Sequence, residues 1–405
     1  MIGREVQAVT GGITTPAGFR AAGVACGIKG NGRPDLALLA TDTPASAAAV
    51  FTTNVAQAAP ILVSREHLQK SAGRASAVVV NSGCANACTG PDGLAHAYAM
   101  ARETAHALGC AAEAVLVAST GVIGVKLVMG HVVDGIATAA ATLSAKGGAD
   151  AARAIMTTDP FSKQAASEAC VRGGTFRVGG MAKGSGMIEP MMATMLGFVT
   201  TDARVEPALL QRALEAAVDD TFNAISIDGG CSTNDCAFAL ANGASGVTLG
   251  DGEYQTLVAA LRSVCEPLAM DIVRGGEGAT KLMTIRVSGA LTDRDAKATA
   301  RAIANSPLVK TAVHGGDPNW GRLVAVAGRA TRTLVLERAR VRIGPIELFS
   351  DGGPHDELAP AAADYLKGKE VTLEVDLGTG GPGKAQMWSC DLSAEYVRIN
   401  AEYRT

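Results

Sequence analysis

Short apolar runs separated by glycines recur along the chain, and this pattern predicts many short elements joined by tight turns. In the first half, apolar residues with helical spacing predict helices at 94–108 and 132–143. Shorter apolar or alternating runs predict strands at 20–29, 36–40, 47–52, 61–63, 77–80, 115–119 and 176–181.

The second half contains the clearest amphipathic helix. Pro207 suits a first helical turn, and the residues after it form one apolar stripe: Leu209, Leu210, Ala213, Leu214, Ala217 and Val218. Further helices are expected at 255–273, with a bend at Pro267, and at 293–304 and 357–367. Strands are expected at 195–200, 282–287, 308–313, 341–349, 371–377 and 385–390. Because strands and helices do not alternate strictly, the pattern predicts an α+β fold of layered sheets and helices.

Composition and charge narrow the classes of function. The 405 residues carry a net charge of −3 and 4% aromatics, so no nucleic-acid partner is expected. No apolar run reaches the ~18 residues of a membrane span. The first residues lack the pattern of a targeting signal, so we expect a cytoplasmic protein without a membrane partner. The nine cysteines lack the spacing of a zinc site, so free thiols and no metal are expected.

The segment 183–203 carries the clearest candidate chemistry. A glycine- and proline-containing loop leads to Ala193 and Thr194, and an apolar strand follows. The Thr194 hydroxyl can attack the preceding carbonyl group and cleave the chain there, if the loop holds the peptide bond strained. The product is an N-terminal threonine whose α-amine, with an ordinary pKa of about 8, can act as base for its own hydroxyl. An Ala-Thr pair alone, however, more often begins a buried strand.

Blocks along nearly the whole chain resemble those of the ornithine acetyltransferase family. They are PAGFRAAGVACGIK (16–29), NSGCANACTG (81–90), ASTGVIG (118–124), AIMTTD (154–159), FNAISIDG (222–229), STND (232–235), GEGATK (276–281), SPLVKTA (306–312), DPNWGR (317–322) and YVRINAEY (396–403). The resemblance implies layers like those of N-terminal-nucleophile enzymes. It also implies acetyl transfer from N²-acetylornithine to glutamate, in the cyclic pathway of arginine biosynthesis, through an acetyl ester on Thr194.

The resemblance also assigns site residues. Thr120 and Gly121 match the pair that stabilises the oxyanion, a role that acyl transfer requires. Lys183 matches a substrate-binding lysine suited to a carboxylate, and Glu277 a carboxylate suited to a substrate ammonium group. The other matching binding positions are Thr157, Asn400 and the last residue, Thr405, which implies that the C-terminal tail docks into the active site.

The family also implies an assembly. Cleavage would leave an α chain, 1–193, and a β chain, 194–405, paired again into a heterotetramer of two α and two β chains. No cofactor is expected, and whether acetyl-CoA serves as an alternative acetyl donor stays open because no phosphate-binding motif decides it. The chain departs from many relatives at Glu189 and Met191, which bears on the rate of cleavage, and at Gly230-Cys231.

Two alternatives remain at this stage. One is a self-processing aminopeptidase that uses the same nucleophile and passes its acyl-enzyme to water instead of to an amino acid. The other is a non-catalytic binding protein that stays uncleaved. A denaturing gel distinguishes the uncleaved binding protein from a self-cleaving enzyme. Two fragments support an enzyme, and one intact band does not.

Overall fold

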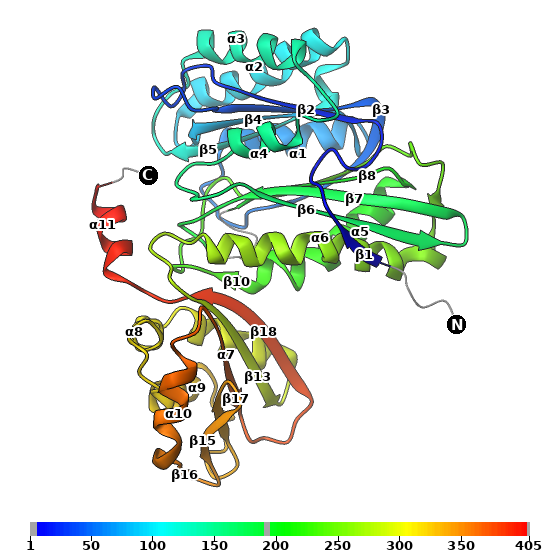
Figure 1. Cartoon of the computed structure of the whole chain (residues 1–405). Coiled ribbons are helices and arrows are strands. Elements are labelled where there is room, and N and C mark those ends of the chain that lie inside the picture. The colour runs from blue at the N-terminus through cyan, green and yellow to red at the C-terminus, as the bar shows by residue number, and fades with distance from the viewer. Residues whose placement is uncertain (1–5, 190–194, 403–405) are drawn as a thin grey trace.

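The computed structural model describes residues 6–189 and 195–402, which form a larger and a smaller domain (Figure 1). The larger domain is built on a nine-stranded sheet of mixed direction. Its strands, in spatial order, are β1 (Val6–Val9), β6 (Lys163–Val171), β7 (Gly174–Lys183), β8 (Leu196–Thr201), β11 (Cys236–Ala241), β3 (Leu36–Phe51), β4 (Arg74–Cys84) and β5 (Val115–Val122), with β2 (Phe19–Val24) beside β3.

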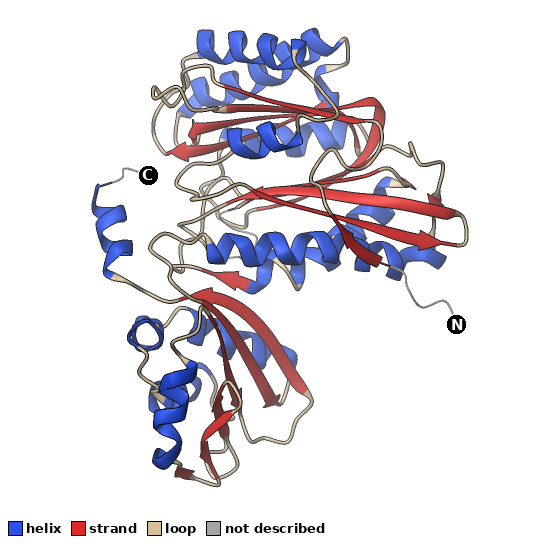
Figure 2. Ribbon diagram, viewed as in Figure 1, coloured by secondary structure: helices blue, strands red, loops and turns tan. Residues whose placement is uncertain are grey.

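This sheet folds over so that its two halves lie as separate layers (Figure 2). Between them lies an apolar core that includes Phe198 and Phe238, whose ring centroids are 5.9 Å apart. The outer face of one half is covered by α2 (Gly90–Leu108) and α3 (Met129–Ala141), and that of the other half by α5 (Pro207–Asp219) and α6 (Tyr254–Arg274). The remaining elements of this domain are α1 (Ala59–Lys70), α4 (Gly148–Ala154), β9 (Arg204–Val205) and β12 (Thr248–Leu249).

The smaller domain has a seven-stranded sheet with its own apolar core. The strand order is β10 (Ile225–Ser226), β18 (Gly383–Cys390), β13 (Leu282–Ala290), β17 (Glu370–Asp376), β14 (Arg340–Ile343), β15 (Ile346–Ser350) and β16 (Gly353–Pro354). Its helices are α7 (Asp293–Ala304), α8 (Pro307–Gly315), α9 (Trp320–Ala330) and α10 (Ala359–Tyr365). After β18 the chain leaves this domain and forms α11 (Ala394–Glu402), which Figure 1 shows running up beside the larger domain.

The layered α+β prediction is confirmed, as are several elements. Helix α7 spans 293–304 as expected, and α6 contains Pro267. The whole apolar stripe predicted for α5 is buried. Among the described residues, no helix is long and apolar enough to cross a membrane.

Three strand predictions were wrong. Residues 61–63 lie inside α1 and 308–313 inside α8, and each of these helices has a proline in its first turn. Short apolar runs do not by themselves distinguish a strand from a buried helical turn, and the prolines mark helix starts. Residues 341–349 form two strands instead of one, because the chain turns at Gly344 with a φ of 59°.

Other predicted element boundaries differ from the observed ones because strands pair with one another in the folded protein. The two strands expected at 36–40 and 47–52 are one strand, β3, whose register with β4 shifts between Ala40 and Ala45. Strands β6 and β11 and helices α4 and α9 were not predicted. All six residues of β11 are buried, so this strand lacks the alternation that marks a half-exposed strand.

Candidate active site

A cavity of about 250 Å³ lies where β5, β7 and helix α11 approach one another. Six of the residues predicted for the site line it, although they span 280 positions of sequence: Thr120, Gly121, Thr157, Lys183, Glu277 and Asn400. The other predicted site residues, Ala193, Thr194 and Thr405, lie outside the described residues. The fold thus brings together every predicted site residue that the structure describes.

Gly121 stands at the end of β5, where this strand comes very close to β4. Its φ is 129°, and a side chain at this position would overlap the backbone of Gly83. Only glycine allows both the conformation and the approach. This requirement explains the glycine that follows Thr120 and fixes the backbone at this wall of the cavity.

Lys183, at the end of β7, is buried with 8% of its surface exposed. Its Nζ donates hydrogen bonds to Thr157 Oγ1 at 2.8 Å and to Thr120 Oγ1 at 3.1 Å. Burial lowers the pKa of Lys183, and the nearby carboxylate of Asp159 opposes that change. The lysine therefore links two predicted site threonines, a contact that the sequence prediction of a carboxylate-binding lysine did not include.

Asp159 holds this part of the site in place from behind. Its carboxylate is buried and accepts hydrogen bonds from the Thr157 amide at 3.0 Å and the Gly184 amide at 2.7 Å. Lys163, fully buried, forms an ion pair with it at 2.6 Å. Burial works to raise the pKa of Asp159, but the charges of Lys183 and Lys163 and these hydrogen bonds outweigh it and lower the pKa to about 2. Asp159 is therefore ionised, and it holds in place the two segments that contain Thr157 and Gly184.

Glu277 faces these groups from the loop after α6. It is 7% exposed, its amide donates to the Ser185 carbonyl oxygen at 2.7 Å, and its carboxylate accepts from Asn400 Nδ2 at 2.9 Å. A side chain at Gly186 would overlap that carboxylate, so glycine is required there. A buried carboxylate with an open side is suited to bind a substrate ammonium group.

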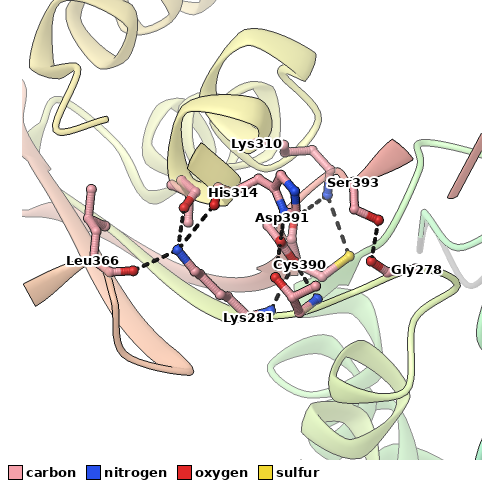
Figure 3. A network of polar contacts seen from close by, with 10 residues as sticks. Gly278, Lys281, Lys310, His314, Leu366, Cys390, Asp391 and Ser393 are labelled. Carbon is pink, nitrogen blue, oxygen red and sulfur yellow. Dashed lines mark hydrogen bonds and ion pairs between the residues drawn. The ribbon is translucent and has the colours of Figure 1, made fainter. Parts of the chain in front are cut away.

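A polar network fixes the Glu277 loop and the start of α11 to the smaller domain (Figure 3). Asp391 accepts from the amides of Thr280 at 2.7 Å and Lys281 at 2.9 Å, and it pairs with His314 Nδ1 at 2.7 Å. Ser393 Oγ donates to the Gly278 carbonyl oxygen at 2.6 Å. These hydrogen bonds fix the Glu277 loop relative to helix α11. The Asn400 side chain is thereby held in contact with the Glu277 carboxylate.

Asp228 anchors the segment that leads to the predicted cleavage position. It accepts from the amides of Met187 at 2.7 Å and Ile188 at 2.8 Å, and from the Tyr396 hydroxyl at 3.2 Å. Two residues on, the Gly230 carbonyl oxygen accepts from the Glu189 amide at 2.7 Å. Gly230 packs against the Met187 backbone, where a side chain would be crowded. This contact gives the departure at Gly230 a structural reason.

Glu189 ties the same segment to the smaller domain. Its Oε1 accepts from Asn305 Nδ2 at 2.6 Å, and Arg301 lies 3.9 Å away. Both partners lie at the C-terminal end of α7 or directly after it. Glu189 therefore makes specific contacts with residues far along the sequence.

Four further residues of the site carry no role in the sequence prediction: Asp159, Asp228, Asn234 and Tyr396. Asn234 lines the cavity and donates to the carbonyl oxygens of Ala85 and Ser119. All four lie inside the quoted sequence blocks, and this was the available signal for them. Among the described residues, no cluster of histidine, cysteine and carboxylate side chains is arranged to hold a metal ion.

Known proteins resemble this chain over nearly its whole length. The family model described as "ArgJ family" matches residues 20–405. The "Arginine biosynthesis bifunctional protein ArgJ" of Symbiobacterium thermophilum is 50% identical over 402 residues, which are 98% of this chain and 99% of that protein.

Solved structures also match. The ornithine acetyltransferase of Mycobacterium tuberculosis in complex with ornithine is 43% identical, with a TM-score of 0.42 over 46% of this chain and 98% of that chain. The L-aminopeptidase D-Ala-esterase/amidase of Ochrobactrum anthropi, described as a variant of the Ntn hydrolase fold, is 13% identical, with a TM-score of 0.43 over 67% of this chain and 88% of that chain.

The cavity and the sequence similarity to ArgJ proteins define an enzyme of the acyltransferase class. Its family follows from the extent of the sequence match. The chain belongs to the ArgJ family.

Proposed function

We propose that this enzyme transfers the acetyl group of N²-acetylornithine to glutamate, in arginine biosynthesis, through an acetyl ester on Thr194. One observation carries the proposal: Thr120, Gly121, Lys183 and Glu277 line a single small cavity. The relative that is 50% identical is named an arginine biosynthesis protein, and this name supports a role in arginine biosynthesis.

The two charged side chains suit amino-acid substrates. Lys183 on one wall and Glu277 on another offer one positive and one negative group, and both substrates carry a carboxylate and an amine-derived group. Both side chains are buried, so their interactions with a ligand are screened little by water. A cavity of about 250 Å³ has room for a small molecule.

The chemistry proceeds in two half-reactions. The Thr194 hydroxyl oxygen attacks the acetyl carbonyl carbon while its proton passes to the α-amine, and the tetrahedral oxyanion is held by Thr120 and Gly121. The carbon–nitrogen bond then breaks, ornithine takes the proton and leaves, and glutamate attacks the acetyl ester by the reverse path. Because Lys183 donates to the Thr120 hydroxyl, the hydroxyl proton is directed away from the lysine and toward a ligand.

The free α-amine arises by self-cleavage between Ala193 and Thr194. The Thr194 oxygen displaces its own nitrogen from the Ala193 carbonyl carbon, and water then hydrolyses the resulting ester to give the chains 1–193 and 194–405. We further propose that two copies of each chain form a heterotetramer in the cytoplasm. The relatives are named bifunctional proteins. We propose acetyl-CoA, as a second acetyl donor to glutamate, for the other activity of this enzyme.

The experiment compares donors and acceptors with purified protein. N²-acetylornithine with glutamate is expected to give N-acetylglutamate and ornithine, and acetyl-CoA is tested in parallel as donor. An aminopeptidase would instead hydrolyse amino-acid amides and transfer no acetyl group. Turnover of amides without acetyl transfer would contradict the proposal, and so would full acetyl transfer by the Thr194→Ala variant.

A further inference from the structure

Two hydroxyl groups on the wall of the cavity have no part in the acetyl transfer described so far. Thr158 Oγ1 and Ser185 Oγ lie 2.6 Å apart, and both residues line the cavity. Ser185 is buried, shortly after the end of β7, and Thr158 directly precedes the buried Asp159. This hydroxyl pair therefore joins two segments of the site that lie far apart in the sequence.

The hydroxyl pair can form further hydrogen bonds with a ligand. One hydroxyl donates to the other, which uses one of their two protons. Within residues 6–189 and 195–402, neither hydroxyl has a second hydrogen-bond partner. Since a hydroxyl group rotates about its carbon–oxygen bond, the pair has both a proton to donate and lone pairs with which to accept. It is therefore able to bind either a cation or an anion.

The Glu277 carboxylate borders the same part of the cavity. The Glu277 amide donates to the Ser185 carbonyl oxygen at 2.7 Å, and a side chain at Gly186, the next residue, would overlap the carboxylate. The amide group of Asn400 is already engaged, because its Nδ2 donates to Glu277 at 2.9 Å and to the Tyr396 carbonyl oxygen at 3.0 Å. The hydroxyl pair is therefore a source of a free proton on this wall.

The proposed reaction brings two opposite charges to this wall. In N²-acetylornithine the α-nitrogen is acylated, so the only ammonium group is at the end of the side chain. In glutamate the side chain ends in a carboxylate, and its oxygen atoms are as many bonds from the α-carbon as the ornithine side-chain nitrogen is. Both α-nitrogens must reach the same acetyl group, so both side-chain ends reach the same place. Glu277 attracts the ammonium group and repels the carboxylate, in a site that water screens little.

We propose that the hydroxyl pair of Thr158 and Ser185 binds the end of the substrate side chain, accepting from the ammonium group of N²-acetylornithine and donating to the carboxylate of glutamate. This inference rests on the proposed function and deepens it. Glu277 supplies most of the attraction for the ammonium group, whereas the hydroxyl pair supplies the hydrogen bond that the carboxylate needs. The two hydroxyl groups therefore matter more for the acceptor than for the donor.

The test measures the two half-reactions separately in Ser185→Ala, which removes one hydroxyl of the pair. Initial rates at varied concentrations of both substrates give kcat/KM for N²-acetylornithine and for glutamate. We expect kcat/KM for glutamate to fall about ten- to a hundredfold, because a hydrogen bond to a charged group is lost. The value for N²-acetylornithine is expected to fall much less, because Glu277 still binds the ammonium group.

Three further variants serve as controls. Glu277→Gln is expected to show the opposite selectivity, with the greater loss for N²-acetylornithine. Thr158→Ser keeps the hydroxyl pair and is expected to keep the wild-type ratio of the two kcat/KM values. Ser167→Ala removes a buried hydroxyl that does not line the cavity and donates to the Ala260 carbonyl oxygen at 3.4 Å. It is also expected to keep the ratio.

An equal fall for both substrates in Ser185→Ala, or an unchanged value for glutamate, would overturn this inference alone. Absence of acetyl transfer in the wild type would instead overturn the proposed function. If Ser185→Ala gives no active enzyme, calorimetric binding to the wild type decides. Norvaline has as many side-chain carbons as glutamate but no polar end, so we expect it to bind at least about tenfold more weakly than glutamate. Equal binding of norvaline and glutamate would contradict the role given to the hydroxyl pair.

Discussion

Lys183 Nζ donates a 3.1 Å hydrogen bond to the hydroxyl group of Thr120, which joins the end of β7 to the end of β5. A hydroxyl group that accepts from a lysine keeps its own proton for another acceptor. The contact therefore orients Thr120 as a donor into the cavity, which is the geometry that a developing oxyanion requires.

Thr120→Ala removes that donor and is expected to slow acetyl transfer by about ten- to a thousandfold in kcat. Thr120→Ser keeps a hydroxyl group and serves as the matched control, with activity near that of the wild type. Steady-state kinetics with N²-acetylornithine and glutamate make the comparison. Equal rates in the alanine and serine variants would remove Thr120 from the oxyanion site.

The ion pair between Asp159 and Lys163 makes a prediction for stability. The pKa of Asp159 falls from 3.8 to about 2 in the folded protein, so ionised Asp159 stabilises the fold above about pH 4. This contribution, about 2 kcal/mol, is lost as the pH falls from about 4 through 2. Urea unfolding of the wild type and of Asp159→Asn across this range is expected to show the loss only in the wild type.

Asp159→Asn at neutral pH leaves Lys163 as a buried cation without its partner. The free energy of unfolding is expected to fall by about 3–5 kcal/mol. The double variant Asp159→Leu with Lys163→Met replaces the pair by apolar groups and is expected to recover much of that loss. Similar stability of the single and double variants would show that the ion pair is not what anchors this segment.

The C-terminal helix provides a further prediction. Asn400 donates to the Glu277 carboxylate at 2.9 Å, so Asn400→Ala removes a contact inside the cavity and is expected to raise KM more than it lowers kcat.

A tag added after Thr405 is expected to impair turnover as well, because the tail is predicted to contribute to the site. The same tag placed before Met1 is the control, and equal kinetics of the two tagged proteins would contradict a role for the C-terminus.

The sequence predicted helices correctly where the apolar periodicity and the residues at the helix ends indicated the same range. In α5 a proline start and an unbroken apolar stripe gave the right helix, and in α7 the predicted range is the observed one. It failed at α8, where a β-branched run resembled a strand although Ser306 caps the helix by accepting from the Val309 amide. The pairing of β13 between β17 and β18 depends on contacts 80 or more residues apart, which periodicity does not encode.

The site was predictable to a different extent. Matching residues to family motifs found the six predicted residues that line the cavity, because five lie in the blocks quoted above and Lys183 opens the segment 183–203. It did not find Asp159 or Asp228, whose importance lies in which amides and charges surround them after folding. The contact of Lys183 with Thr120 is also a tertiary fact, since the two residues are 63 positions apart.

Intact-protein mass spectrometry of an active preparation, incubated with N²-acetylornithine alone, tests the central claim most directly. We expect two polypeptides, 1–193 and 194–405, with the second heavier by one acetyl group that glutamate then removes. The Thr194→Ala variant is expected to give one uncut and unacetylated chain without activity. A fully active wild-type preparation that contains only the 405-residue polypeptide would contradict the account.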